Sequence, residues 1–210
     1  MIEINMETWK RKEHFQFFKN VAYPIYNICF DVDVTKLLQY TKESQLSFHL
    51  AMVFLTTSAL NQIENFKYRL RGETVVLHEF LTPSFADLGK GDDLFKMVTV
   101  EMENTMKRFI EKAVYKSANQ KDYFVVSDFA NRDDFVFYSS LPWITFTSID
   151  HTINLKKEDA IPRVSWGKYY RHGEVVLMPF NIQVNHLFVD GVHLGKFKEI
   201  LDDKLSHPNS

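Results

Sequence analysis

Apolar residues recur along the chain at two different spacings, which predicts a protein built from both helices and strands. A spacing of three to four residues predicts helices over residues 9–19, 36–45, 47–63, about 103–117 and about 192–205, with Thr35 as the N-cap of the second. The pattern over residues 47–63 is the longest of these and is apolar over a wide face, so we expect that helix to be buried.

Runs that favour β-structure predict the strands. They cover residues 26–32, 74–78, 94–101, 143–149, 163–170 and 174–184. Residues 171–173 separate the last two runs as a short turn, which predicts a hairpin. Because strands and helices do not alternate regularly, the pattern predicts an α/β fold with a mixed or antiparallel sheet rather than a doubly wound parallel one.

Composition narrows the class of protein further. Hydrophobic residues make up 45% of the chain, and 19 of its 210 residues are Phe, which is enough for a substantial core. We see no repeat and no linker-like segment, so we expect a single domain over residues 1–210. The net charge of −2 favours neither nucleic acid nor an anionic membrane surface as a partner.

The N-terminus and the cysteine content indicate the compartment. The chain opens without the charged and apolar blocks of a signal peptide, and its longest apolar stretch, residues 48–60, is too short to span a bilayer. Cys29 is the single cysteine, which excludes an intrachain disulfide and fits a reducing environment. We therefore expect a cytoplasmic protein without membrane contact, in which Cys29 is buried by packing.

Motifs for several common chemistries are absent from the sequence. It contains no Gly-rich phosphate loop, dinucleotide fingerprint, Gly-x-Ser-x-Gly elbow, His-Glu-x-x-His motif or cysteine pair. His186, Asp190 and His193 would share one face of a helix and could then ligate a metal. Because Val184 is strand-like and Gly191 follows Asp190, we expect the helix to start after His186, and we expect no metal site.

The segment from His186 to Gly191 is the best candidate for chemistry. It follows a strand pattern and precedes a helix pattern, so His186 can project from the end of a rigid strand. A histidine there can act as a general base, Asp190 can hold the local backbone, and Gly191 relaxes the turn. Taken alone, the segment is equally consistent with a turn that happens to carry a histidine.

Four segments together extend this interpretation. WKRKEHF (residues 9–15), LPWITFTS (141–148), PRVSWGKYY (162–170) and QVNHLFVDGVH (183–193) resemble the chloramphenicol acetyltransferase family in order and approximate spacing. The His-x-x-x-Asp-Gly element alone is shared with other CoA-dependent acyltransferases, whereas the four segments in order are specific. The resemblance implies a two-layer α/β sandwich with a mixed, largely antiparallel sheet. It also implies a homotrimer with active sites between subunits.

The resemblance implies direct acetyl transfer from acetyl-CoA to a hydroxyl of a small acceptor, with chloramphenicol as the first candidate, and this transfer would inactivate the antibiotic. No cofactor is implied beyond acetyl-CoA as co-substrate. His186 matches the general base that takes the proton of the acceptor hydroxyl. Thr145 stands where the family usually has Ser, and its hydroxyl would donate to the oxyanion. On its own, Thr145 would be read as a strand-favouring residue.

Two further matches concern support of the site. Asp190 matches a structural Asp that pairs with the Arg of the N-terminal Trp-x-Arg, here Arg11, and the pair should hold the loop of His186. On their own, both would be read as ordinary exposed charges. Ser165 matches a Thr that orders a water near the oxyanion. Of the other histidines, His193 would support the site at most. We expect the remaining ones to be structural or on the surface: His14, His49, His78, His151, His172 and His207.

Three positions depart from the family pattern. Asn185 replaces the first of two consecutive histidines, Thr145 replaces Ser, and Asp87 stands where an apolar residue of the acceptor pocket is usual. Phe18 and Phe85 still match aromatic positions of that pocket, so a small-molecule acceptor is retained. Two alternatives follow. One is an acyltransferase for another alcohol or thiol, as in the dihydrolipoamide acyltransferase core, although no lipoyl or linker segment is seen here. The other is a non-catalytic trimer that binds a small molecule.

Overall fold

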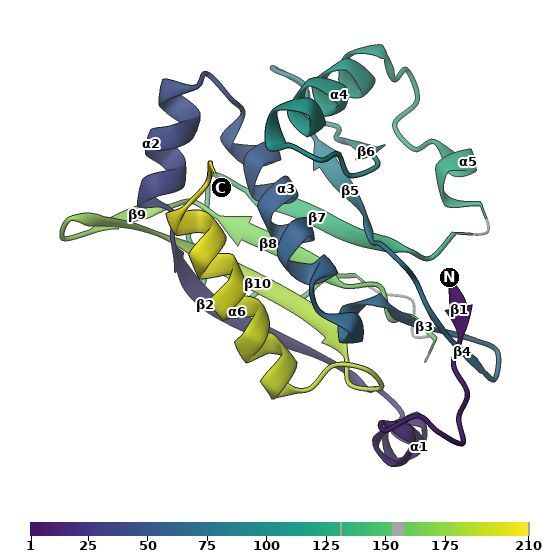
Figure 1. Ribbon diagram of the computed structural model, residues 1–210. Coiled ribbons are helices and arrows are strands. Elements are labelled where there is room, and N and C mark those ends of the chain that lie inside the picture. Colours follow the sequence, from purple (N-terminus) through teal and green to yellow (C-terminus); the bar gives the residue numbers. More distant parts are fainter. Residues whose placement is uncertain (131, 153–157, 210) are drawn as a thin grey trace.

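The computed structural model describes residues 1–130, 132–152 and 158–209, and its centre is a seven-stranded sheet (Figure 1). The strand order is β2-β10-β8-β7-β5-β6, with β9 paired to β10 outside this path. The strands are β2 (Ile25–Asp33), β5 (Thr82–Asp87), β6 (Lys96–Thr99), β7 (Phe135–Leu141), β8 (Arg163–Gly167), β9 (Tyr170–His172) and β10 (Val175–Asn185). Only the β5–β7 and β7–β8 pairs of this sheet are parallel, so the sheet is mixed and largely antiparallel, as predicted.

The larger helices cover one face of this sheet, and a small second sheet lies beside it (Figure 1). The helices are α1 (Lys12–Lys19), α2 (Thr35–Glu43), α3 (Phe48–Asn61), η1 (Glu64–Lys67), α4 (Met106–Asn119), α5 (Val126–Phe129) and α6 (Gly191–Ser206). The small sheet has the order β1-β4-β3, with β1 (Ile2–Glu3), β3 (Tyr68–Arg71) and β4 (Thr74–Leu77). None of the described helices combines the length and apolarity that crossing a membrane requires.

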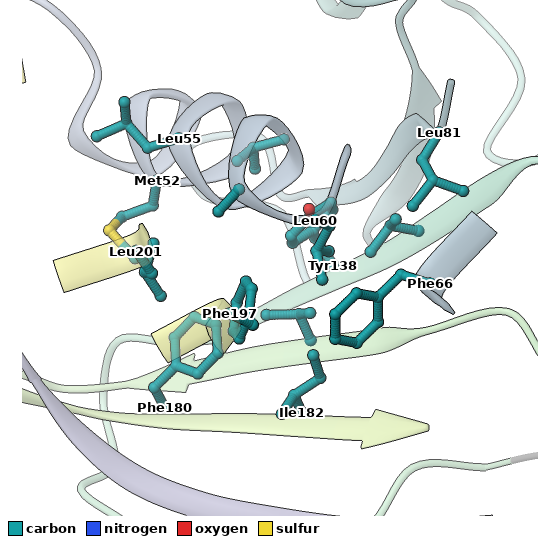
Figure 2. Packing of buried hydrophobic residues seen from close by; sticks show 14 of the residues in the cluster. Met52, Leu55, Leu60, Phe66, Leu81, Tyr138, Phe180, Ile182, Phe197 and Leu201 are labelled. Atoms are coloured by element: carbon teal, nitrogen blue, oxygen red, sulfur yellow. The ribbon is translucent and has the colours of Figure 1, made fainter. Parts of the chain in front are cut away.

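The core lies between α3, α6 and the sheet. Met52, Leu60, Phe197 and Phe180 are all buried there and pack in one layer (Figure 2). Helix α3 is buried around most of its circumference, as its wide apolar face predicts. A buried Phe of this kind contributes about 3–5 kcal/mol relative to Ala. The core therefore fixes β10, and with it the strand end from which the candidate site projects.

Strand β10 is buried on both faces, but with different chemistry on each. Apolar Phe180 and Ile182 belong to the core, whereas the alternate residues Asn181 and Gln183 are polar and equally buried. Side chains of a strand alternate between faces, so the polar pair faces away from the helices. The loop after β7 covers this polar face, because the His151 backbone N–H donates to Gln183 Oε1 at 3.2 Å.

The predicted strand over residues 143–149 is wrong. These residues form a turn and an irregular loop, and the strand is β7, which ends at Leu141 just before them. The first residues of β7, Phe-Val-Phe-Tyr, form a continuous apolar run, because this strand pairs in parallel with neighbours on both sides. Such a run lacks the alternation of apolar and polar residues that a half-buried strand shows. Residues 143–149 do alternate, but their first apolar residue, Trp143, is exposed.

Smaller corrections concern element ends. Thr35 is not an N-cap but lies in the first turn of α2, where its N–H donates to Asp33 Oδ1 at 2.9 Å. The hairpin is present, but its turn falls after His172, where Gly173 has a positive φ of 62°. Helix α6, with 16 residues, is longer than α3 with 14. Apart from the element ends, Cys29 was expected to be buried but is half-buried, and Asn181 Nδ2 donates to its Sγ at 3.3 Å.

Candidate active site

The junction between β10 and α6 holds His186 at the end of the strand. The His186 backbone N–H donates to the Pro24 carbonyl at 2.7 Å, which continues the pairing beyond β10. The neighbouring Asn185 is buried, and its amide bonds the loop on two sides. Its Oδ1 accepts from Leu187 N at 2.9 Å, and its Nδ2 donates to Asp159 O at 3.0 Å. The backbone that carries His186 is thus fixed by the sheet and by Asn185.

The His186 ring is held between two aromatic side chains. It stacks on Phe18 with centroids 4.0 Å apart and planes 12° apart, and it packs against Tyr26 at 4.6 Å. Its Nδ1 is buried 3.1 Å from Asp190 Oδ1, although no hydrogen bond links it to any described residue. The side chain as a whole is 33% exposed. Nε2 is therefore the ring nitrogen left open to a substrate.

Arg11 joins the start of α1 to this junction. Its Nε donates to Leu187 O at 2.8 Å, and its Nη2 donates to His186 O at 3.0 Å and to Asp190 Oδ1 at 2.6 Å. Its Nη1 also contacts Asp190 Oδ2, so the ion pair is bidentate. The structure thus brings Arg11 together with Asp190 and with the backbone carbonyls of His186 and Leu187.

Electrostatics at this junction follow from the Arg11 contact. The hydrogen bonds from Arg11 hold the pKa of the Asp190 carboxyl below its ordinary value, so Asp190 is an anion at neutral pH. The Asp190 backbone N–H donates to His193 Nδ1 at 2.8 Å. Burial lowers the pKa of His193, so this imidazole is neutral and serves as a hydrogen-bond acceptor for the loop.

Thr145 lies in the loop that follows β7. Its Oγ1 donates to Lys168 O at 3.2 Å, and the residue is otherwise exposed. The loop packs directly on the end of β8, since a Cβ at Gly167 would lie 2.6 Å from the Ile144 carbonyl oxygen. A side chain at position 167 would push the loop away, so Gly167 sets the position of Thr145.

The structure does not bring Thr145 and His186 together within one chain. In the antiparallel pair, Trp166 of β8 lies opposite Phe180, six positions before His186 on β10, and Lys168 continues away from His186. At 3.3 Å per residue the separation along the sheet is roughly 20 Å or more. One small substrate cannot reach both side chains of the same chain.

A cavity of about 1140 Å³ lies on the Thr145 side of the molecule. Its walls come from α3, β5, α4, β7 and the loop after β7, and they include Phe85, Asp87 and Tyr138. Phe85 is buried and lines this cavity, whereas Phe18 stacks on His186. The two aromatic residues predicted for one acceptor pocket are thus in different parts of the chain.

His151 lines the same cavity and contacts Ser165, a pairing that the sequence did not predict. Its Nε2 lies 3.3 Å from the Ser165 Oγ and 3.1 Å from Asn181 Oδ1. Burial lowers the pKa of His151, so its imidazole is neutral. His151 follows the 141–148 segment closely, but no spacing in the sequence indicated that it would contact residues of β8 and β10.

His49 also lines the cavity, and both of its ring nitrogens are buried without a hydrogen bond to any described residue. The ring packs against Phe85 and Trp166, with centroid distances of 5.8 and 5.4 Å. Burial lowers the pKa of His49 to about 4, so the folded protein keeps this imidazole neutral over most of the acid range.

We expect this histidine to reduce stability in acid. In the unfolded chain it binds a proton below about pH 6.5, so the unfolded state gains protons that the folded state excludes. Relative to His49→Phe, the free energy of unfolding of the wild type should fall by about 3 kcal/mol between pH 6.5 and 4. Chemical denaturation of both proteins across this range measures the difference, and parallel pH profiles would contradict it.

Comparisons with known proteins agree on one family. A family model described as chloramphenicol acetyltransferase matches residues 1–202. Chloramphenicol acetyltransferases of Klebsiella sp and Bacillus pumilus are each 26% identical, covering 92% and 96% of this chain and 88% and 92% of their own lengths. A solved structure of a chloramphenicol acetyltransferase superposes with a TM-score of 0.90 at 26% identity, over 97% of this chain and 100% of its own.

A more distant structure shares the fold alone. It is a probable dihydrolipoamide acetyltransferase from Listeria monocytogenes 4b F2365, with a TM-score of 0.65 at 16% identity, and it covers 100% of this chain and 97% of its own. Among the described residues, no group of three or more His, Cys, Asp or Glu side chains is arranged to hold a metal ion.

Proposed function

Since the chain belongs to the chloramphenicol acetyltransferase family, we propose that it transfers the acetyl group of acetyl-CoA to a hydroxyl of chloramphenicol and so inactivates the antibiotic. The family consists of acyltransferases, so the chain is an enzyme of this class. The observation that carries the proposed mechanism is the placement of His186. Its ring is clamped, its Nδ1 is buried beside Asp190, and its Nε2 is left open.

In this mechanism His186 is the general base. Its Nδ1 faces the Asp190 carboxylate at 3.1 Å, and Nε2 takes the proton of the acceptor hydroxyl. The hydroxyl oxygen attacks the thioester carbonyl of acetyl-CoA and forms a tetrahedral oxyanion. When this intermediate collapses, the C–S bond breaks, the leaving sulfur takes the proton back from Nε2, and CoA and the acetyl ester are released. No cofactor besides acetyl-CoA takes part.

We propose that the working site is assembled between copies of the chain, in a homotrimer. The supporting observation is the separation of roughly 20 Å or more between His186 and Thr145 along the sheet of one chain. His186 of one copy would then face the cavity of the next copy, which holds Phe85 and the loop of Thr145. Direct transfer requires both substrates to be held at one point, and this arrangement provides it.

Thr145 is the proposed donor to the oxyanion. Its hydroxyl donates to the Lys168 carbonyl in the free protein and would turn to the substrate as negative charge develops. Ser165 is proposed as a positioning residue, since its buried hydroxyl meets His151 at the cavity wall.

Replacing Thr145 with Val keeps the shape of the side chain and removes the donor. We expect kcat to fall by roughly a hundredfold with little change in KM, because the bond forms only in the transition state. Thr147→Val and Ser148→Ala are matched controls, since they remove two neighbouring hydroxyls of the same loop. If either control loses most of its kcat while Thr145→Val stays active, the residue replaced in that control is the oxyanion donor instead.

A thiol-release assay tests the proposed function. CoA should be freed from acetyl-CoA when chloramphenicol is added and not in its absence, with one acetyl group gained by the antibiotic. CoA release with another alcohol but not with chloramphenicol would support the acyltransferase reaction and assign it a different acceptor. Binding of chloramphenicol by the folded protein without CoA release would contradict the reaction and favour a binding module.

A further inference from the structure

The cavity that we assign to the acceptor carries negative charge in its wall. Asp87, the last residue of β5, lines it and is half-buried, and its Oδ2 accepts a hydrogen bond from the Ser117 hydroxyl. Asp93, in the exposed loop that follows β5, lines the cavity as well. A half-buried carboxylate without an ion-pair partner interacts favourably with a cation that binds beside it.

Neither of the two nearby cations forms an ion pair with Asp87 among the described contacts. Arg163 also lines the cavity, but it donates to both carboxylate oxygens of Asp159, at 3.1 and 2.7 Å, and to Ile161 O at 3.0 Å. Lys96 lies opposite Asp87 in the β5–β6 pair, yet its ammonium donates to the Ser117 carbonyl, and Lys96 is not among the residues that line the cavity. The described cavity wall therefore offers two carboxylates and no cation that is free of a carboxylate partner.

The two histidines add no positive charge. Burial lowers the pKa of both His49 and His151, so both rings are neutral at pH 7. Asn181 Nδ2 donates to Asn27 Oδ1, so Asn181 Oδ1 must accept the proton of His151 Nε2. His151 is left with a lone pair on Nδ1, which is a further hydrogen-bond acceptor.

The carboxylate of Asp87 and the lone pair of His151 favour a substrate that donates hydrogen bonds. On the basis of the proposed function, we infer that the preferred acceptor is a hydroxylated amine, whose protonated amino group lies near the reacting hydroxyl and binds to Asp87. A neutral amide, as in chloramphenicol, would occupy the same cavity but form no ion pair with Asp87. Asp87 is thus a specificity residue for the acceptor rather than a catalytic one.

Two acceptors that carry the same hydroxyls but differ in charge test whether the enzyme prefers a cationic acceptor. One is chloramphenicol, and the other is its deacylated form with a dimethylated nitrogen, which is cationic at pH 7 and cannot be acetylated on nitrogen. We expect the wild type to favour the cationic diol in kcat/KM by about tenfold or more. Asp87→Asn should lower this preference by about tenfold, whereas Asp122→Asn, outside the cavity wall, should leave it unchanged.

The failure of this inference can be told from failure of the proposed function. Turnover of chloramphenicol with no preference for the cation, or a ratio unaffected by Asp87→Asn, would overturn the inference and leave the function intact. If neither compound is acetylated, calorimetric titration with the cationic diol decides. Binding that is lost in Asp87→Asn supports the inference, and equal or absent binding in both proteins overturns it.

Discussion

His186→Ala should reduce CoA release from acetyl-CoA and chloramphenicol by roughly a thousandfold. The substitution removes Nε2, which takes the proton of the acceptor hydroxyl in the proposed mechanism. Binding of acetyl-CoA should persist, because the imidazole acts on the acceptor proton and does not hold the nucleotide. Steady-state kinetics and a separate titration with acetyl-CoA measure the two effects.

The control for this substitution must separate chemistry from packing, since the His186 ring also stacks on Phe18. His186→Phe keeps an aromatic ring between Phe18 and Tyr26 and should be as inactive as the Ala variant. His172→Ala, on the exposed strand β9, should retain full activity. A folded His186→Phe protein with more than about a tenth of wild-type turnover would contradict the role of His186 as general base.

Arg11→Ala should destabilise the fold by about 3–5 kcal/mol, because it leaves Asp190 as a largely buried anion without its partner. It also removes the donors to the His186 and Leu187 carbonyls. Arg11→Lys keeps the charge but cannot make this set of contacts from one ammonium, so it should recover only part of the loss. Urea denaturation of the three proteins gives the free energies.

Two comparisons make this prediction specific. Lys198→Ala breaks an exposed i,i+4 pair with Asp202 and should cost less than about 1 kcal/mol. Arg11 lowers the pKa of Asp190, so the stabilisation by the pair is present above the unfolded pKa of about 3.9 and is lost as the pH falls through the folded value. An Arg11→Ala penalty that is small at pH 7, or that does not shrink in acid, would contradict a structural role of the pair.

Local patterns in the sequence were sufficient for much of the fold. The turn after β10, the start of α6 and the hairpin before it depend on short-range signals such as Gly191 and the apolar spacing beyond it. Strand β7 was missed because a strand paired on both sides carries a continuous apolar run that does not alternate. The strand was therefore predicted at residues 143–149, which form an irregular loop.

The candidate site was predictable only in part. The contact of Arg11 with Asp190 followed from the family resemblance, and the structure places the two side chains in a bidentate pair. The distance between Thr145 and His186 depends on the register of β8 against β10, which no local pattern encodes. His151 was assigned to structure or surface for the same reason, since its partners Ser165 and Asn181 are distant in sequence.

Mixing two inactive variants tests most directly whether the reaction occurs at a site shared by two chains. His186→Ala and Thr145→Val are unfolded together and refolded, and CoA release is measured with chloramphenicol. Random assembly gives about a quarter of the sites both wild-type residues, so the mixture should regain about a quarter of wild-type activity. Activity that stays at the sum of the two parents, while mass spectrometry shows mixed oligomers, would contradict the account.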